Sequence, residues 1–165
     1  MNIAHSLQSI GFLSDFSESV LAYPIVLSLH LTCIALFGGM ILMTNLRLLG
    51  VTFKSVTITE MVTSLRWWKR GGVVVMICTG SLLAASEAEK YAPNPYFLTK
   101  MIVLGLIGVH GLIFRPLVYT RTQELDRSPV IPTVVKVAAI LSITLWTTMF
   151  TMGRLIAYWE GGPEQ

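Results

Sequence analysis

Four long apolar runs dominate the sequence and restrict the folds that are open to it. The runs cover residues 20–46, 71–85, 96–114 and 137–153, and Lys100 is the only charged residue within them. A helix of about 20 apolar residues spans the hydrocarbon layer of a membrane, which is roughly 30 Å thick. Charged residues make up 13% of the chain, about half the share in soluble domains. The sequence therefore predicts an all-α membrane protein built as a four-transmembrane-helix bundle.

We expect residues 1–165 to form a single integral membrane domain. The predicted transmembrane helices lie at about 22–46, 69–88, 96–117 and 134–158. Ile3, Leu7 and Ile10 recur at helical spacing and predict an N-terminal amphipathic helix at about 3–16 on the outer surface; the alternative is a frayed tail that only partners order. A second interfacial helix is expected at 57–68 on the inner surface.

The flanking charges predict the orientation. Nine of the twelve Lys and Arg residues lie in the segments that join the first to the second and the third to the fourth predicted helix, and three lie on the other side. Loops rich in Lys and Arg stay in the cytoplasm. We therefore expect a multi-pass protein of the bacterial inner (plasma) membrane with both termini periplasmic. The basic residues flank the apolar runs, so nucleic acid is not an expected partner.

Few catalytic motifs are available to the chain. Cys33 and Cys78 stand 45 positions apart in apolar runs, a spacing that excludes CxxCH haem attachment and a zinc finger. No P-loop, GxSxG or HExxH pattern occurs in a usable context. No acidic residue lies in mid-membrane, which argues against a carboxylate-type carrier. We expect no stand-alone enzyme, and an oxidoreductase subunit is the enzymatic option left.

Ionisable groups inside a membrane are costly and mark candidate sites. His30 and His110 are the histidines inside apolar runs, and they are the predicted metal ligands for haem b. Arg154 and Lys100 are placed to hold propionates at the outer surface, and His5 of the surface helix is expected near His30. A quinone is the other possible cofactor. The competing interpretation is that each imidazole only bonds a neighbouring helix.

The depths of the two histidines differ in the predicted helices. His30 lies about 10 Å and His110 about 21 Å from the outer ends of their helices. Two ligands of one iron need similar depth, so each histidine is open to a different partner: a methionine that completes a haem site, a quinone or another subunit. The candidate methionines are Met76, Met149 and Met152. We expect His30 to matter more, because His110 has only apolar neighbours. The threonines 144, 147, 148 and 151 are expected to bond their own helix.

Several motifs resemble a family of small, uncharacterised bacterial four-helix integral membrane proteins. They are Tyr23-Pro24 with His30, Asn45-Leu-Arg-Leu-Leu-Gly50, Phe97-Leu-Thr-Lys100 and Gly153-Arg154-Leu-Ile-Ala-Tyr158. The resemblance covers residues 23–158 and implies architecture and a bacterial inner membrane, not a reaction. The family has an acidic residue where this chain has Asn45, so the ion pair with Arg47 that the family implies is not expected. Histidines in the first and third helices are also similar to the b561-like cytochromes at the level of fold.

Two functions remain open. The first is a membrane subunit of an electron-transfer complex that binds haem b or quinone between the membrane pool and a periplasmic redox partner. The second is a non-catalytic anchor or assembly subunit of a larger membrane complex, which short loops and a surface helix would suit. In both cases the lipid bilayer and other membrane or periplasmic redox subunits are the expected partners.

Overall fold

The computed structural model describes residues 5–6 and 9–159, and this part of the chain contains helices and loops but no strand. The prediction of an all-α protein is confirmed. The order of elements is α2 (Gly11–Glu18), α3 (Ala22–Leu49), α4 (Ile58–Ser86), α5 (Ala88–Tyr91), α6 (Pro95–Phe114), the π-helical turn η1 (Arg115–Tyr119), α7 (Thr122–Arg127), α8 (Thr133–Leu155) and the 3-10 turn η2 (Ile156–Tyr158). Residues 3, 4, 7 and 8 of the predicted surface helix lie outside the described residues.

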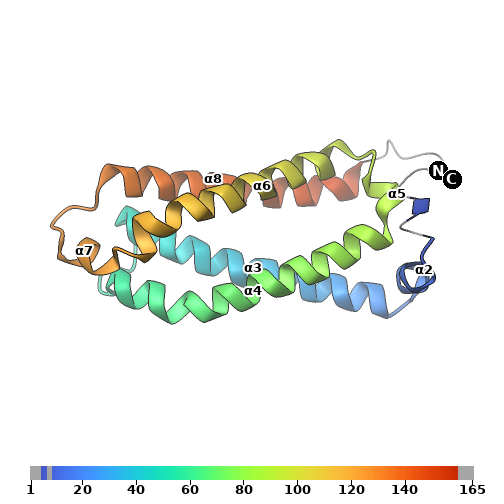
Figure 1. The fold of residues 1–165 in the computed structure, drawn as a ribbon, viewed down its shortest axis with the longest axis horizontal. Coiled ribbons are helices and arrows are strands. Elements are labelled where there is room, and N and C mark those ends of the chain that lie inside the picture. The colour runs from blue at the N-terminus through green and yellow to red at the C-terminus, as the bar shows by residue number, and fades with distance from the viewer. Residues whose placement is uncertain (1–4, 7–8, 160–165) are drawn as a thin grey trace.

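The four long helices form two layers (Figure 1). Helices α3 and α4 pack together in one layer, α6 and α8 pack together in the other, and contacts between α3 and α8 join the layers. The short helices α2 and α5 lie at the end that holds both termini, and α7 lies at the opposite end. We call the α2–α5 end of the bundle the outer end and the α7 end the inner end, after the orientation that the charges predict.

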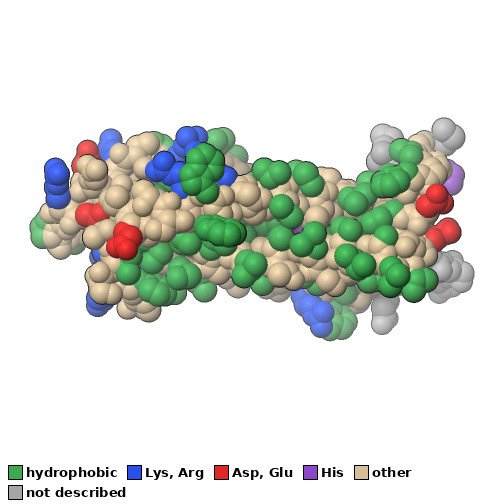
Figure 2. All heavy atoms as spheres, turned by 90° about the horizontal axis from the view of Figure 1, so that it is seen from below, with side chains coloured by type: hydrophobic (Ala, Val, Ile, Leu, Met, Phe, Trp, Pro, Cys, Tyr) green, Lys and Arg blue, Asp and Glu red, His purple; other side chains and the backbone are tan. Residues whose placement is uncertain are grey.

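Within the described residues, three helices are long and apolar enough to cross a membrane: Ala22–Leu49, Pro95–Tyr119 and Thr133–Tyr158. Many of their large apolar side chains are exposed, among them Leu36, Leu112 and Val134. Figure 2 shows apolar side chains spread over the middle of the molecule and most charged side chains toward its two ends. This surface fits contact with lipid. Helix α4 does not meet the criteria of length and apolar composition that these three helices meet.

Helix α4 differs from its expected form. It is one continuous helix of 29 residues, so the expectation of a separate interfacial helix at 57–68 is wrong. The Thr57 side chain begins the helix by accepting a hydrogen bond from the Glu60 N–H. The Gly71-Gly72 pair does not break it, because the ring of Phe37 packs on Gly72, where an added Cβ would lie 3.1 Å from the ring.

Two apolar clusters hold the layers together. The inner cluster lies toward α7 and contains Leu48, Val62, Phe114, Val118 and Ala139, with other buried side chains around them. The middle cluster contains Phe37, Val103, Trp146 and Met149. Phe37 and Trp146 meet edge to face with ring centroids 5.3 Å apart. The clusters fix the registers of α3, α6 and α8.

Helix ends are capped where the sequence provides the residues. Gly50 ends α3 in the left-handed conformation at φ 72°, which glycine adopts without steric cost. Asn94 begins α6: its Oδ1 accepts from the N–H groups of Tyr96 and Phe97, and Pro95 occupies the first turn. The buried Asn94 amide also donates to the Ile156 carbonyl over 3.4 Å, which links α6 to the end of α8.

Asp126 of α7 ties the inner loops to α4. Its two carboxylate oxygens accept from the N–H groups of Ile58 and Thr59 over 2.6 and 3.0 Å, at the positive end of the α4 dipole. Partial desolvation alone would raise the pKa of Asp126, but the hydrogen bonds from Thr59 and Ile58 and the charge of Arg47 outweigh it and hold the pKa below its ordinary value. Arg47 itself donates to the Val56 carbonyl.

We predict that Asp126→Ala lowers the free energy of unfolding by about 1–2 kcal/mol, the cost of a lost N-terminal cap. Because folding lowers the pKa of Asp126, this stabilisation is present above the ordinary carboxyl pKa near 3.8 and is lost as the pH falls through the lowered folded value. Unfolding by SDS titration at several pH values measures both effects. Glu124→Ala on the same helix is the control, and an equal loss in both variants would contradict the prediction.

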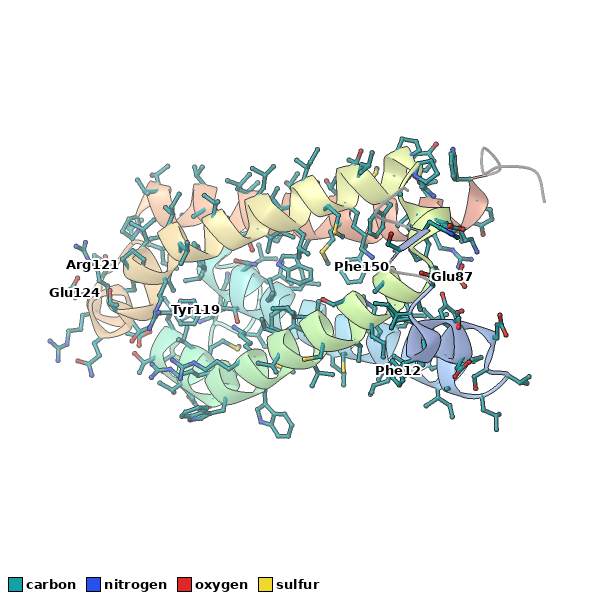
Figure 3. The ribbon with its side chains drawn as sticks, turned by 45° about the vertical axis from the view of Figure 1, so that its right-hand side comes forward. Phe12, Glu87, Tyr119, Arg121, Glu124 and Phe150 are labelled. Atoms are coloured by element: carbon teal, nitrogen blue, oxygen red, sulfur yellow. The ribbon has the colours of Figure 1, made fainter. Side chains whose placement is uncertain are left out.

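The contact between α3 and α8 yields a second prediction. A Cβ added at Gly38 would lie 2.9 Å from the Phe150 ring, whereas one added at Gly39 meets nothing within 4 Å. Figure 3 shows Phe150 between the two layers. We expect Gly38→Ala to destabilise the protein by about 1–3 kcal/mol through overpacking, and Gly39→Ala to be neutral or stabilising, because alanine favours a helix by up to about 1 kcal/mol. Thermal unfolding of both variants in detergent tests this, and equal midpoints would refute it.

Candidate functional site

The His30 imidazole is fixed across the α3–α4 contact. Its Nδ1 lies 2.7 Å from the Thr79 hydroxyl oxygen. The Thr79 hydroxyl donates its own hydrogen to the Val75 carbonyl over 2.7 Å, so its oxygen is left to accept. In its neutral form, His30 must then carry its hydrogen on Nδ1. The lone pair on Nε2 is left for another partner.

Gly80 makes this position of the ring possible. A Cβ on Gly80 would lie 3.0 Å from Cε1 and 3.6 Å from Nε2 of His30. Any larger residue would therefore push the imidazole away from α4. The glycine and the threonine stand side by side on α4, so one turn of helix both seats the ring and orients it.

The Lys100 side chain reaches the same region from α6. Its Nζ would lie 3.7 Å from a Cβ built on Gly153, so the chain of Lys100 crosses to α8. Its ammonium is also near enough for its charge to act on the His30 imidazole. Two contacts therefore join the long helices in pairs: His30 joins α3 to Thr79 and Gly80 of α4, and Lys100 joins α6 to Gly153 of α8. Sequence reasoning expected His30 and Lys100 in the same region; the structure shows His30 in contact with α4 and Lys100 in contact with α8.

Some polar atoms of this site have hydrogen-bonding capacity that the described residues do not satisfy. Among the described residues, none accepts a hydrogen bond from the Lys100 ammonium and none pairs with Nε2 of His30. Both side chains are half-buried. The site therefore offers up to three hydrogen-bond donors from Lys100 and one acceptor or metal ligand from His30.

Arg154 and His5 lie elsewhere. Arg154 is exposed, donates to the Tyr158 hydroxyl over 3.0 Å and lies over the Tyr158 ring. His5 is also exposed, with its Nδ1 2.6 Å from Oε1 of Glu89 near α5. Both side chains thus lie on the surface. The partner that the structure gives His5 is Glu89, not the expected His30.

His110 lies deeper in the bundle. It is ten residues beyond Lys100 on α6, which is about 15 Å along the helix. Its ring faces Phe114, and its buried Nε2 has no hydrogen-bond partner. The described residues hold no group of three or more His, Cys, Asp and Glu side chains that could bind a metal ion. The described residues thus offer Nε2 of His30 as one nitrogen ligand, and they offer His110 only at another depth.

The remaining candidates take part in packing. Met149 is buried in the middle cluster, and Met76 packs against it. The hydroxyls of Thr144, Thr148 and Thr151 each donate to the carbonyl four residues earlier. The expectation that these threonines bond their own helix is confirmed for these three.

Sequence reasoning missed a second polar group near the inner end. Lys69 is only 8% exposed, donates to the Thr44 hydroxyl over 2.6 Å, and also reaches the Tyr119 hydroxyl over 3.3 Å. Tyr119, labelled in Figure 3, comes from η1 at the α7 end of the bundle. The buried amide of Asn45 donates to Ser142 over 3.0 Å. The helical spacing of Val62, Lys69 and Met76 on one face would have signalled that Lys69 points inward.

We predict that Thr79→Val removes the fixed tautomer of His30. In the wild-type protein, ¹⁵N NMR of the His30 ring should show hydrogen on Nδ1 alone when the ring is neutral. In Thr79→Val a signal from the Nε2–H tautomer should appear, because the acceptor for Nδ1–H is gone. Thr63→Val, whose hydroxyl bonds only its own helix, is the matched control. A mixture of tautomers in the wild type would contradict the assignment.

Comparison with known proteins places the chain in a family. No curated protein and no solved structure is detectably similar to it. A family model described as "Family of unknown function (DUF6644)" matches residues 8–159, which include the whole candidate site. The chain therefore belongs to this uncharacterised family.

Proposed function

We propose that the protein is a multi-pass subunit of the bacterial inner membrane that crosses it four times, with both termini in the periplasm. Helix α4 supports the fourth crossing by its length, since 29 residues extend about 43 Å. Its second half, from Gly71 to Ser86, is uncharged, and its basic residues Arg66, Lys69 and Arg70 all lie in the first half. The nine-to-three distribution of Lys and Arg supports the orientation.

We further propose that the outer site binds the headgroup of a quinone. The observation that carries this is that the described residues supply no hydrogen-bond partner for the Lys100 ammonium or for Nε2 of His30. A quinone carbonyl oxygen accepts a hydrogen bond, as Lys100 requires. A quinol hydroxyl donates one, as Nε2 of His30 requires. The apolar helices around the site suit a molecule that arrives from the membrane.

The two side chains would divide the chemistry between them. The Lys100 ammonium would stabilise negative charge on the quinone oxygen while electrons arrive or leave. Nε2 of His30 would accept a proton from the quinol hydroxyl, and Thr79 would hold the imidazole in place. Oxidation of a quinol releases two electrons, which would pass to a periplasmic redox partner, and two protons, which would leave one after the other through Nε2 of His30.

Haem b is the second candidate for the same atoms. A histidine that binds a metal usually donates its other ring N–H to a neighbouring acceptor, and the bond from Nδ1 of His30 to Thr79 has this form. A shared haem between His30 and His110 is less favoured, because the imidazoles lie at different depths. A non-catalytic anchor subunit is the third option, and it requires neither group.

We predict that the purified protein binds decylubiquinone and that His30→Ala and Lys100→Gln each weaken the affinity at least tenfold. Titration in detergent, followed by tryptophan fluorescence and calorimetry, measures the affinity. Lys90→Gln removes an exposed charge near α5 and should leave it unchanged. His110→Ala should also retain binding, because His110 lies deeper than the proposed site.

The outcomes separate the three candidates. An absorption spectrum with an α-band after dithionite reduction, lost in His30→Ala, would replace the quinone by haem b. Equal loss of haem in His30→Ala and His110→Ala would support the hypothesis that both histidines bind one haem. Absence of both haem and quinone binding, with copurification of another membrane subunit, would favour the anchor.

A further inference from the structure

The surface of α4, in the half of the helix that begins at Ile58, combines two exposed tryptophans with basic side chains. Trp67 and Trp68 are 72% and 71% exposed, and Arg66 and Arg70 beside them are exposed as well. Lys69, within the same stretch, is turned into the bundle. Helix α4 has no acidic residue from Met61 to Ser86, so this face has only positive charge.

The guanidinium of Arg70 is held close to Trp67. It lies over the indole ring, 5.0 Å from its centroid, which is a cation–π contact. This contact leaves the planar N–H fork of Arg70 free to bind a phosphate. Tryptophan side chains prefer the level of lipid headgroups, so the pair marks the depth at which a phosphate would lie.

An apolar stripe continues from this pair toward the outer end. Gly71, Val74, Ile77 and Cys78 follow Trp67 at helical spacing, and all four are exposed. A Cβ built on Gly71 meets no atom within 4 Å, so the surface beside Arg70 is open. The stripe extends in the direction in which an acyl chain runs from its headgroup.

We propose that this face, defined by Trp67, Arg70, Gly71, Val74 and Ile77, binds an anionic phospholipid of the inner leaflet. Arg70 contacts the headgroup phosphate, Trp67 packs beside the glycerol region, and an acyl chain lies along Gly71, Val74 and Ile77. The positive charge of the face favours an anionic headgroup. The apolar stripe that follows the cation and the tryptophan along the helix favours an acyl chain, so the face suits a phospholipid. The inference rests on the four-span arrangement proposed above but not on the quinone site.

Native mass spectrometry of the full chain from nanodiscs tests the proposal, with equal amounts of phosphatidylglycerol and phosphatidylcholine supplied. The wild type should retain phosphatidylglycerol preferentially. Arg70→Gln should lower this preference about fivefold, the effect of one basic residue near an anionic surface. Arg127→Gln removes an exposed arginine of α7 at the same end and is the matched control. Trp67→Leu tests the tryptophan with the charge intact.

The results decide the proposal in each case. Loss of preference in Arg70→Gln and Trp67→Leu, with Arg127→Gln like the wild type, supports it. No preference in the wild type, or equal loss in both arginine variants, overturns it in favour of general charge. A wild-type dimer that Arg70→Gln converts to a monomer also overturns it, because the face would then hold a second copy. Decylubiquinone titration of Arg70→Gln keeps this test separate from the quinone site, which should be unaffected.

Discussion

Rings seated on glycines set how closely α3 approaches its neighbours. Phe37 packs on Gly72 and His30 on Gly80, both of α4, and Phe150 of α8 packs on Gly38 of α3. Helices in hydrocarbon gain little from burying apolar surface against each other, so close contact between small residues and larger side chains drives their packing. One of these three contacts also builds the candidate site, because the space that admits the His30 ring is the missing side chain of Gly80.

Two lysines within the long helices, the buried Lys69 and the half-buried Lys100, show why the region of Lys100 is the candidate site. Lys69 and Lys100 both lack a carboxylate partner among the described residues. The Lys69 ammonium is nevertheless served by the Thr44 and Tyr119 hydroxyls and by the Tyr119 ring. Among the described residues, no hydroxyl bonds the Lys100 ammonium and no aromatic ring makes a cation–π contact with it. The same residue type is therefore satisfied at one end and open to a ligand at the other.

The sequence predicted the parts of the fold that follow from hydropathy. An all-helical chain and the long apolar helices follow from uncharged runs, which need only length and composition. The continuity of α4 did not follow, because Lys69, Arg70 and two glycines resemble a boundary until Phe37 and Thr44 are known to pack against them. Contacts between helices depend on rotation about each helix axis, which hydropathy does not specify.

The same limit applies to the prediction of the candidate site. His30 could be singled out as a costly group inside the membrane, and the direction of the two helices predicted that Lys100 lies in the same outer region. Arg154 had the same depth but points away, toward Tyr158. Thr79 and Gly80 were not singled out, because a threonine and a glycine in a membrane helix are ordinary residues. Only the hydrogen bond from Thr79 to Val75 shows that the hydroxyl must accept from His30.

Helix α4 connects the two ends of the molecule as a single rigid element. Its first N–H groups are held by Asp126 in the inner loops, its Lys69 is bonded to α3 and η1, and its Thr79 orients His30. A break near residue 69 would have separated these three functions. Because the helix is continuous, a displacement of its capped end would shift Thr79 and Gly80 together. One helix therefore carries both the cap on Asp126 and the seat of His30, although α7 and α5 lie at opposite ends of the bundle.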